Sequence, residues 1–368
     1  MPPHAPLNST RGLLAAIEAL PLAGPIRILN LSGNQERVIT LSAMRGMLPA
    51  AVTLLSGPGC AASLCPEADL YQAVQLAQRE DVTLLVAETM LQLPLGTRVF
   101  GPRTLLEART QGADVRVVEA PIEALLAAQA EPQRQMVYIA AGFETLLAPL
   151  AGMVLDDGLP DNLSFLLSGR RAEPLIEQIL GRENPGVEAL LLPGNRCAVT
   201  GTAAWEGIVH KFGIPAAIAG YTDIGILAAI HSLLLQHCRG EARLDNFYQT
   251  LARPQGDAMA LDRLYRVFDV VDGVWRGVGR IQGTAFRLRH AYDVVNADRR
   301  HPDFRAELQR DGGEMPDGCE CAAVLLGRQE PADCQQFSVG CRIDSPYGPC
   351  MASEDGTCYL RSGNRRVA

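Results

Sequence analysis

The sequence lacks any segment of the kind that directs a chain into or across a membrane. No apolar run is long enough to cross a bilayer. The N-terminal stretch MPPHAPLNSTRGLLAAIEALP has no basic region followed by an apolar region, and it predicts an amphipathic helix behind the cap residues Asn8, Ser9 and Thr10. We therefore expect a soluble protein in the cytoplasm, where thiols are kept reduced.

Basic clusters are also missing. The formal net charge is −8 and the pI is near 5.4, lysine is nearly absent, and arginines occur together only in short pairs such as Arg170–Arg171. Nucleic-acid binding needs a basic face, so we expect no nucleic-acid partner. There is no Walker loop and no His-Glu-x-x-His element, and Gly277 with Gly279 is too short for a dinucleotide fingerprint.

Cysteine, by contrast, is concentrated at one end of the chain. The segment from Pro316 to Gly363 is rich in Gly, Pro, Asp and Ser and has no sustained helical or alternating apolar pattern. Apolar burial alone does not account for its order, so disulfides, zinc or an iron–sulfur cluster must hold it. The cysteines available for this are Cys319, Cys321, Cys334, Cys341, Cys350 and Cys358.

The spacing of these cysteines favours an iron–sulfur cluster. A reducing compartment disfavours a structural disulfide framework. Zinc sites usually contain two short Cys-x2-4-Cys knuckles, whereas the only close pair here is Cys319-Glu-Cys321. Four thiolates with long gaps are more typical of a cluster. A cluster that only orders the segment and one with redox activity are both open.

Upstream of this segment, short apolar runs alternate with helical patterns. Strand–helix alternation of this kind is typical of parallel sheets covered on both faces. Since four runs precede residue 130 and four follow it, we predict two tandem parallel-sheet α/β domains (12–130 and 131–255) and a C-terminal cysteine-rich [4Fe–4S] domain (256–368). The runs are Ile26–Leu31, Ala51–Leu55, Val82–Ala87, Val115–Glu119, Met136–Ala141, Leu163–Leu167, Ala189–Leu192 and Ile214–Ala219.

The residues after these runs are the candidate site, because ligands bind at the carboxyl ends of parallel strands. Two such edges facing each other would form a cleft. Its candidate residues are Cys60, Cys65 and Glu144, although the two thiols could also be simple core residues and Glu144 a first-turn carboxylate of a helix. From Asp223 to Val267 the pattern is helical, and Trp275-Arg-Gly-Val-Gly279 opens a segment that we expect to be irregular.

Several motifs together carry a family resemblance. The tail reads Cys319-x14-Cys334-x6-Cys341-x16-Cys358, and upstream lie Ser56-Gly-Pro-Gly-Cys60, Ala141-Gly-Phe-Glu-Thr145, a Gly-Ile-Pro-x-x-x-Ala-Gly-Tyr run at 213–221, and Trp275-Arg-Gly-Val-Gly279. In this combination the chain resembles the hydrogenase maturation factor HypD family over essentially its whole length.

The resemblance implies an accessory maturation protein rather than a classical enzyme. It implies a [4Fe–4S] cluster on Cys319, Cys334, Cys341 and Cys358, with Cys321 and Cys350 as rival ligands. Members of the family hold a low-valent iron with cyanide and carbonyl ligands, for nickel–iron hydrogenase, in a cleft between two α/β domains. The partners implied are a HypC-like small chaperone and a HypE-like protein that delivers cyanide. The resemblance also implies a site role for Glu144.

The chain departs from the family at its cleft loops. The family's Cys-Gly-x-His is Ser32-Gly-Asn-Gln35 here, and the second thiol of Gly-Pro-Gly-Cys-x-x-Cys is Ser63, with Cys65 two residues later. Glu88 stands for an aspartate, Asn195 for a histidine and Thr222 for a glutamate. A hydroxyl is a poor ligand for low-valent iron.

Two hypotheses follow from these departures. In the first, the protein still handles a metal complex, through Cys60, Cys65 and, if it reaches across the cleft, Cys197. In the second, it is a non-carrier paralogue that acts as a scaffold or redox partner and docks on maturation proteins. Core packing is the alternative for Cys197, and it is also what we expect for Cys238.

Overall fold

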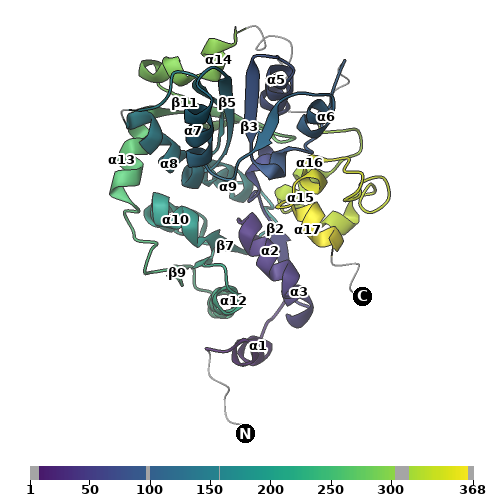
Figure 1. The fold of residues 1–368 in the computed structure, drawn as a ribbon. Coiled ribbons are helices and arrows are strands. Elements are labelled where there is room, and N and C mark those ends of the chain that lie inside the picture. Colours follow the sequence, from purple (N-terminus) through teal and green to yellow (C-terminus); the bar gives the residue numbers. More distant parts are fainter. Residues whose placement is uncertain (1–7, 97–99, 157, 303–314, 364–368) are drawn as a thin grey trace.

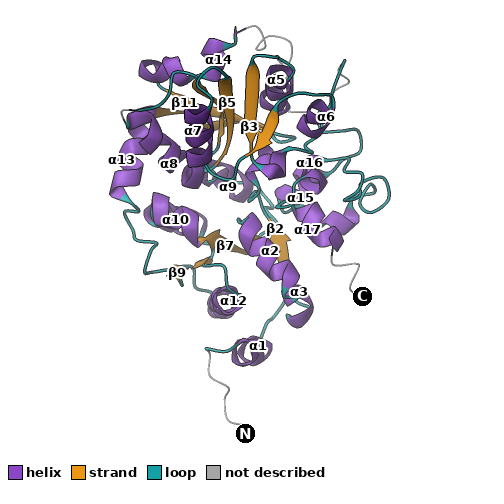
Figure 2. Cartoon of the chain, in the orientation of Figure 1, coloured by secondary structure: helices purple, strands orange, loops and turns teal. Residues whose placement is uncertain are grey.

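The computed structural model describes residues 8–96, 100–156, 158–302 and 315–363, and two parallel sheets form its frame (Figures 1 and 2). Sheet A has the strand order β2-β1-β7-β8-β9, and sheet B has the order β4-β3-β5-β6. All neighbouring strands in both sheets are parallel. The α/β class is therefore confirmed. Sheet A contains β1 (Ile26–Asn30), β2 (Val52–Ser56), β7 (Ala189–Pro193), β8 (Ala216–Ala219) and β9 (Leu244–Asn246), and sheet B contains β3 (Val82–Val86), β4 (Val115–Val117), β5 (Gln135–Gly142) and β6 (Leu163–Gly169).

Several of the helices that alternate with these strands begin at polar cap residues. Ser9, Thr104 and Thr222 each accept a hydrogen bond from a backbone N–H in the first turn of the helix that follows. None of the helices in the described ranges is long and apolar enough to span a membrane. The helices up to the last strand of sheet A are α1 (Thr10–Glu18), α2 (Gly33–Leu41), α3 (Met44–Met47), α4 (Ala61–Leu64), α5 (Glu67–Ala77), η1 (Glu88–Met90), α6 (Leu105–Thr110), α7 (Pro121–Ala130), α8 (Glu144–Leu155), α9 (Glu173–Leu180), α10 (Gly194–Thr200), α11 (Ala203–Phe212) and α12 (Asp223–Arg239).

The order in which the chain builds the two sheets differs from the tandem arrangement expected from the sequence. The chain forms β1 and β2 of sheet A, then all of sheet B, and then returns to sheet A with β7, where Ile28 pairs with Ala189. Sheet B is therefore built from one continuous stretch of the chain, whereas sheet A is built from two stretches that lie on either side of it. The boundary between the two sheets does not fall at residue 130. An apolar run predicts a buried strand, but it carries no information about which strand lies beside it.

The segment after α12 also differs from expectation, because it is not irregular. Strands β10 (Phe268–Trp275) and β11 (Gly279–Leu288) form an antiparallel hairpin, preceded by α13 (Ala258–Val267) and followed by η2 (His290–Val295) and α14 (Ala297–Arg300). The hairpin packs on sheet B, where Phe268 and Phe286 share a core with Leu147 and Phe165. Much of this segment therefore packs with sheet B, although the sequence placed it with the cysteine-rich segment, while Trp275 and Ile281 join the core of sheet A and the tail.

The cysteine-rich tail packs against sheet A. It contains α15 (Cys321–Leu325), η4 (Pro331–Asp333), α16 (Pro349–Ala352) and α17 (Thr357–Gly363), and Figure 1 shows these elements beside α2 and β2. Leu325 and Met351 belong to the same core as Leu29 and Leu55, and Arg27 Nη2 donates a hydrogen bond to the carbonyl of Gly327 at 2.8 Å. The tail is thus held by apolar burial on sheet A as well as by its own sulfur contacts.

Candidate functional site

The carboxyl ends of six strands open onto one cleft of about 250 Å³. The loops after β1, β2 and β7 reach it from sheet A, and those after β3, β4 and β5 reach it from sheet B. Its lining includes Ser32, Cys60, Thr89, Thr145 and Asn195. The prediction that strand ends of the two sheets face a common cleft is confirmed.

Two of these loops touch each other. A Cβ atom on Gly59 would lie 2.5 Å from the backbone nitrogen of Gly33, so no side chain fits between the loop after β1 and the loop after β2. This close approach places Ser32 and Cys60 on neighbouring parts of the cleft wall.

Ser32 and Gln35 both have structural tasks in this arrangement. Ser32 Oγ accepts a hydrogen bond from Gln35 N at 3.2 Å and caps α2. Gln35 is fully buried, does not line the cleft, and its Nε2 donates to the carbonyl oxygens of Leu192 at 3.1 Å and Ala219 at 2.8 Å. Gln35 therefore ties the loop after β1 to the ends of β7 and β8, a role that the sequence did not reveal.

Cys60 is the only cysteine among the described residues that line the cleft. Its Sγ accepts a hydrogen bond from Ser63 Oγ at 3.1 Å and lies 3.2 Å from Ser353 Oγ, which belongs to the tail. Burial raises the pKa of the Cys60 thiol to about 11. At neutral pH Cys60 is therefore a protonated thiol, with one neighbour in its own loop and one in the tail.

Cys65 faces a different environment. Its Sγ lies 3.4 Å from Ser168 Oγ at the end of β6, and it does not line the cleft. Burial, followed by the nearby Asp69 carboxylate, raises the pKa of the Cys65 thiol to about 12. Both thiols are free. Within its own loop, Cys60 therefore contacts Ser63 and not Cys65. Cys65 lies outside the cleft that Cys60 lines.

Glu144 lies immediately behind the cleft wall. It is the first residue of α8 and is 1% exposed, while its neighbours Phe143 and Thr145 line the cleft. Burial, followed by the charge of Glu173, raises the pKa of Glu144 to about 8. Glu144 Oε1 lies 3.9 Å from Arg171 Nε, and Oε2 has no hydrogen-bond partner among the described residues.

Arg196 is a cleft residue that the sequence reasoning missed. It is 4% exposed, and its guanidinium carbon lies 3.9 Å from the centroid of the Phe143 ring. Its Nε and Nη1 atoms have no hydrogen-bond partner in the described part of the chain. The available signal was its place in Pro193-Gly194-Asn195-Arg196, where a charged residue comes directly after a buried strand.

Asn195 is held in one orientation beside Arg196. Its Oδ1 accepts hydrogen bonds from the hydroxyl of Tyr221 and, at 2.8 Å, from the backbone N–H of Arg196. With Oδ1 engaged twice, the Nδ2 amide group is the part of Asn195 that remains for the cleft.

The other candidates lie away from the cleft. Cys197 is fully buried in a core, where burial raises its pKa to about 12. Cys238 Sγ lies 3.8 Å from the carbonyl of Pro21. Glu88 is exposed outside the cleft, whose lining instead includes Thr89, and Thr222 caps α12. Core packing of Cys197 is the alternative that the structure supports.

The six tail cysteines share one core. The Cys321 thiol lies within hydrogen-bonding reach of Cys319, Cys350 and Cys358, and its interaction with Cys350, followed by that of Cys358, lowers the pKa of Cys350. Burial, and to a smaller extent the neighbouring Cys319 and Cys334, raises the pKa of Cys341. In the described ranges, no group of three or more His, Cys, Asp or Glu side chains is arranged so that it could hold a metal ion.

Comparison with known proteins gives a consistent picture. The sequence model of HypD, described as the hydrogenase formation hypA family, matches residues 8–362. The hydrogenase expression/formation protein HupD of Azotobacter chroococcum is 33% identical over 365 residues, which cover 96% of this chain and 93% of that protein. The hydrogenase maturation factor HypD of Azotobacter vinelandii is 32% identical over 354 residues, which cover 93% of this chain and 90% of that protein. The chain belongs to the HypD family.

Proposed function

We propose that this chain is a cytoplasmic maturation scaffold for a hydrogenase metallocentre, in which the cysteine tail acts together with the cleft. The observation that carries the proposal is the position of Cys60. Cys60 lines the cleft, and its sulfur lies 3.2 Å from Ser353 Oγ, which is three residues after Cys350. A sulfur-rich tail is therefore joined to the cleft at one thiol.

The tail supplies donors of the chemical type that an iron–sulfur cluster uses, namely cysteine thiols. Six thiols share one core, and the proposed ligand set is Cys319, Cys334, Cys341 and Cys358. Cys321 and Cys350, which lie within hydrogen-bonding reach of each other, would then form an adjacent thiol pair. A [4Fe–4S] cluster held by the four ligands would supply electron-transfer chemistry.

The cargo proposed for the cleft is the low-valent iron complex with cyanide and carbonyl ligands of nickel–iron hydrogenase. Cys60 is the soft donor that the cleft offers, and Ser63 Oγ donates a hydrogen bond to its sulfur at 3.1 Å. Partners of the kind found for the family, a HypC-like small chaperone and a HypE-like protein, would dock at this cleft and deliver the ligands.

Analysis of the purified protein tests the cluster. Anaerobic purification should give a brown protein with about four iron and four sulfide per chain. Replacing Cys341 by Ala should remove the colour, whereas Cys238→Ala should retain it because Cys238 lies against Pro21, outside the tail. Tight zinc without sulfide would contradict the cluster.

Vibrational spectroscopy tests the cargo. Protein purified with its HypC-like and HypE-like partners should show cyanide and carbonyl stretching bands, and Cys60→Ala should lose them while Cys65→Ala keeps them. Cys65 is a suitable control because its thiol faces Ser168 outside the cleft.

A second candidate function is favoured by the structural tasks of Ser32 and Gln35. Because Ser32 caps a helix and Gln35 ties three strand ends, neither residue offers a ligand to the cleft. The protein would then be a scaffold or redox partner without cargo. In that case the cluster would be present, and the cyanide and carbonyl bands would be missing even with both partners.

A further inference from the structure

Arg196 is a buried cation, and two of its three guanidinium nitrogens lack hydrogen-bond acceptors in the described part of the chain. It is 4% exposed, and its Nε and Nη1 have no partner among the residues that the structure describes. Buried charged groups are costly unless they are paired and hydrogen-bonded. The Phe143 ring covers one face of the guanidinium at 3.9 Å, so an acceptor would have to approach in the plane of its N–H groups. Both residues belong to the cleft wall.

Further donors surround the same part of the cleft. The N-terminus of α8, a helix of twelve residues, is not capped by a side chain, and Phe143 and Thr145 at this end line the cleft. The first turn of such a helix presents free N–H groups that favour an anion. Asn195 adds its Nδ2 amide, because its Oδ1 is already engaged by Tyr221 and by the backbone of Arg196.

We propose that this cleft binds a small monoanionic oxyanion of the short carboxylate class, held by Arg196, the Asn195 amide and the N-terminus of α8. The site goes beyond iron handling, since it uses no thiol and no cluster. It is small, at about 250 Å³, below the 300 Å³ at which pockets for drug-sized ligands begin. The ligand therefore contains few heavy atoms.

The charges around the cleft select a single negative charge. Glu119 and Asp355 also line the cleft, and although Asp355 forms an ion pair with Arg37 at 2.9 Å, both carboxylates repel a dianion. Glu144 adds little negative charge at neutral pH, because burial raises its pKa to about 8. The charged and titratable groups that act on Glu144 or respond to its charge from neighbouring elements include Glu173, Arg196, Arg171, Cys197 and Tyr265.

Titration calorimetry of the full-length protein, without partners and in a buffer free of oxyanions, tests the site. At pH 6.5 acetate and formate should bind in the millimolar range. Arg196→Gln should weaken acetate binding at least about tenfold, because it removes a charge-assisted contact. The matched control is Arg79→Gln, which makes the same charge change at an ion pair with Asp81 outside the cleft and should leave the affinity within about twofold.

A second variant guards against misfolding of Arg196→Gln. Asn195→Asp retains the acceptor oxygen that Tyr221 and Arg196 N–H use, and it places a negative charge in the cleft, so acetate binding should weaken while the unfolding transition is kept. Raising the pH from 6.5 to 9 should weaken acetate binding in the wild type, and Glu144→Gln should remove most of that loss.

The outcomes that would overturn the proposal are separate from those that concern iron. No heat of binding with acetate or formate, equal losses in the Arg79 and Arg196 variants, or tighter binding of inorganic phosphate at pH 8 than of acetate would each overturn it. Since the measurement involves no cargo and no partner, a failure of iron handling would leave the acetate result unchanged.

Discussion

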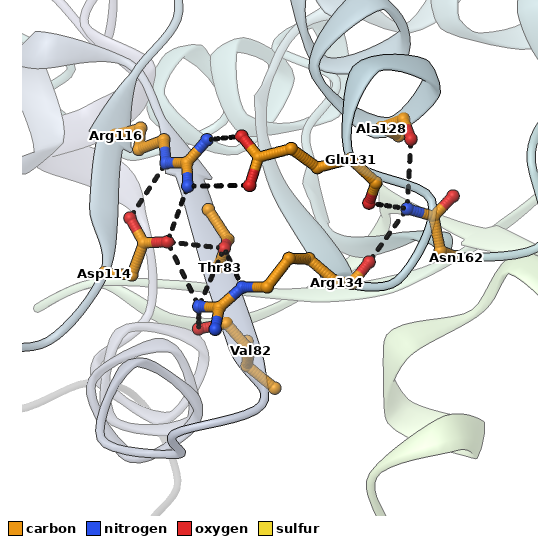
Figure 3. Close-up of polar contacts among 8 residues, drawn as sticks. All are labelled: Val82, Thr83, Asp114, Arg116, Ala128, Glu131, Arg134 and Asn162. Atoms are coloured by element: carbon orange, nitrogen blue, oxygen red, sulfur yellow. Dashed lines mark hydrogen bonds and ion pairs between the residues drawn. The ribbon is translucent and has the colours of Figure 1, made fainter.

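The two edges of sheet B treat charge in opposite ways. At the amino edge, Asp114 accepts hydrogen bonds from Arg116 at 2.8 Å and Arg134 at 3.1 Å, and Arg116 also pairs with Glu131 (Figure 3). Asn162 completes this network by donating to three backbone carbonyls. Every charged side chain drawn there has a partner.

At the carboxyl edge of sheet B and in the helix facing it, buried groups lack partners. Glu144 Oε2, Glu173 Oε2 and two nitrogens of Arg196 are buried without a hydrogen bond in the described part of the chain. Unsatisfied buried groups lower stability, and they persist where a protein binds or transforms something. The comparison therefore separates an amino edge whose charged groups stabilise the fold from a carboxyl edge whose unpaired groups are suited to binding.

The largest effect on stability should follow from removing the hydrogen bonds of Asn162 at the amino edge. Asn162→Ala removes donors to Ala128 O at 3.1 Å, Glu131 O at 3.0 Å and Arg134 O at 2.8 Å, in a site that is 5% exposed. We expect a loss of about 3 kcal/mol in the free energy of unfolding, measured by urea denaturation. Acetate binding by the variant should be unchanged, and a loss of binding would break the division between the two edges.

At the carboxyl edge, removing a charge should stabilise the protein. An unfolded carboxyl ionises near pH 4.5, whereas Glu144 in the folded protein has a pKa of about 8. Between these values the folded state holds a proton that the unfolded chain has lost, so stability falls as the pH rises from about 4.5 to about 8. Glu144→Gln should therefore be more stable at pH 8.5 by on the order of 2 kcal/mol, and equal to the wild type at pH 4.

The control for this prediction is Glu183→Gln, an exposed position that should show no change at either pH. If Glu144→Gln destabilised the protein at pH 8.5, the carboxylate would be ionised and paired in the fold, and the contrast between the edges would be weaker than described.

A smaller effect should follow from removing one ion pair of the amino edge. The Arg116 side chain is 38% exposed, so solvent screens its pairs with Asp114 and Glu131. Arg116→Met should cost about 0.5–1 kcal/mol in low salt, and the cost should shrink in 1 M salt. A salt-independent loss above 2 kcal/mol would show that this network acts as a buried one.

The smallest change should come from restoring a single thiol in the cleft. Ser32→Cys is not expected to rescue hydrogenase activity in a strain lacking its own HypD, because Ser63 and Asn195 still differ from the family. The fuller test combines Cys at positions 32 and 63 with His at 35 and 195, although replacing Gln35 removes its bonds to Leu192 and Ala219. Rescue by the unmodified chain would instead assign the iron to Cys60.

The sequence predicted the parts of this molecule that depend on local patterns. All eight apolar runs are strands, and the cleft is where the strand ends place it. Local sequence patterns could not predict that β7 pairs with β1, since strand order depends on long-range packing. Nor could it show that Gln35 turns away from the cleft or that Ser63 contacts Cys60, because side-chain direction follows from the surrounding loops.

The return of the chain to sheet A has a consequence for biosynthesis. β1 cannot gain its neighbour β7 until the whole of sheet B has been made, and Arg27 meets Glu188 across 161 residues. Sheet B, whose four strands are consecutive in the chain, is complete earlier as the chain leaves the ribosome. The apolar faces of β1 and β2 are therefore exposed for longer than those of sheet B, and a nascent chain arrested before β7 would be a species for chaperones to protect.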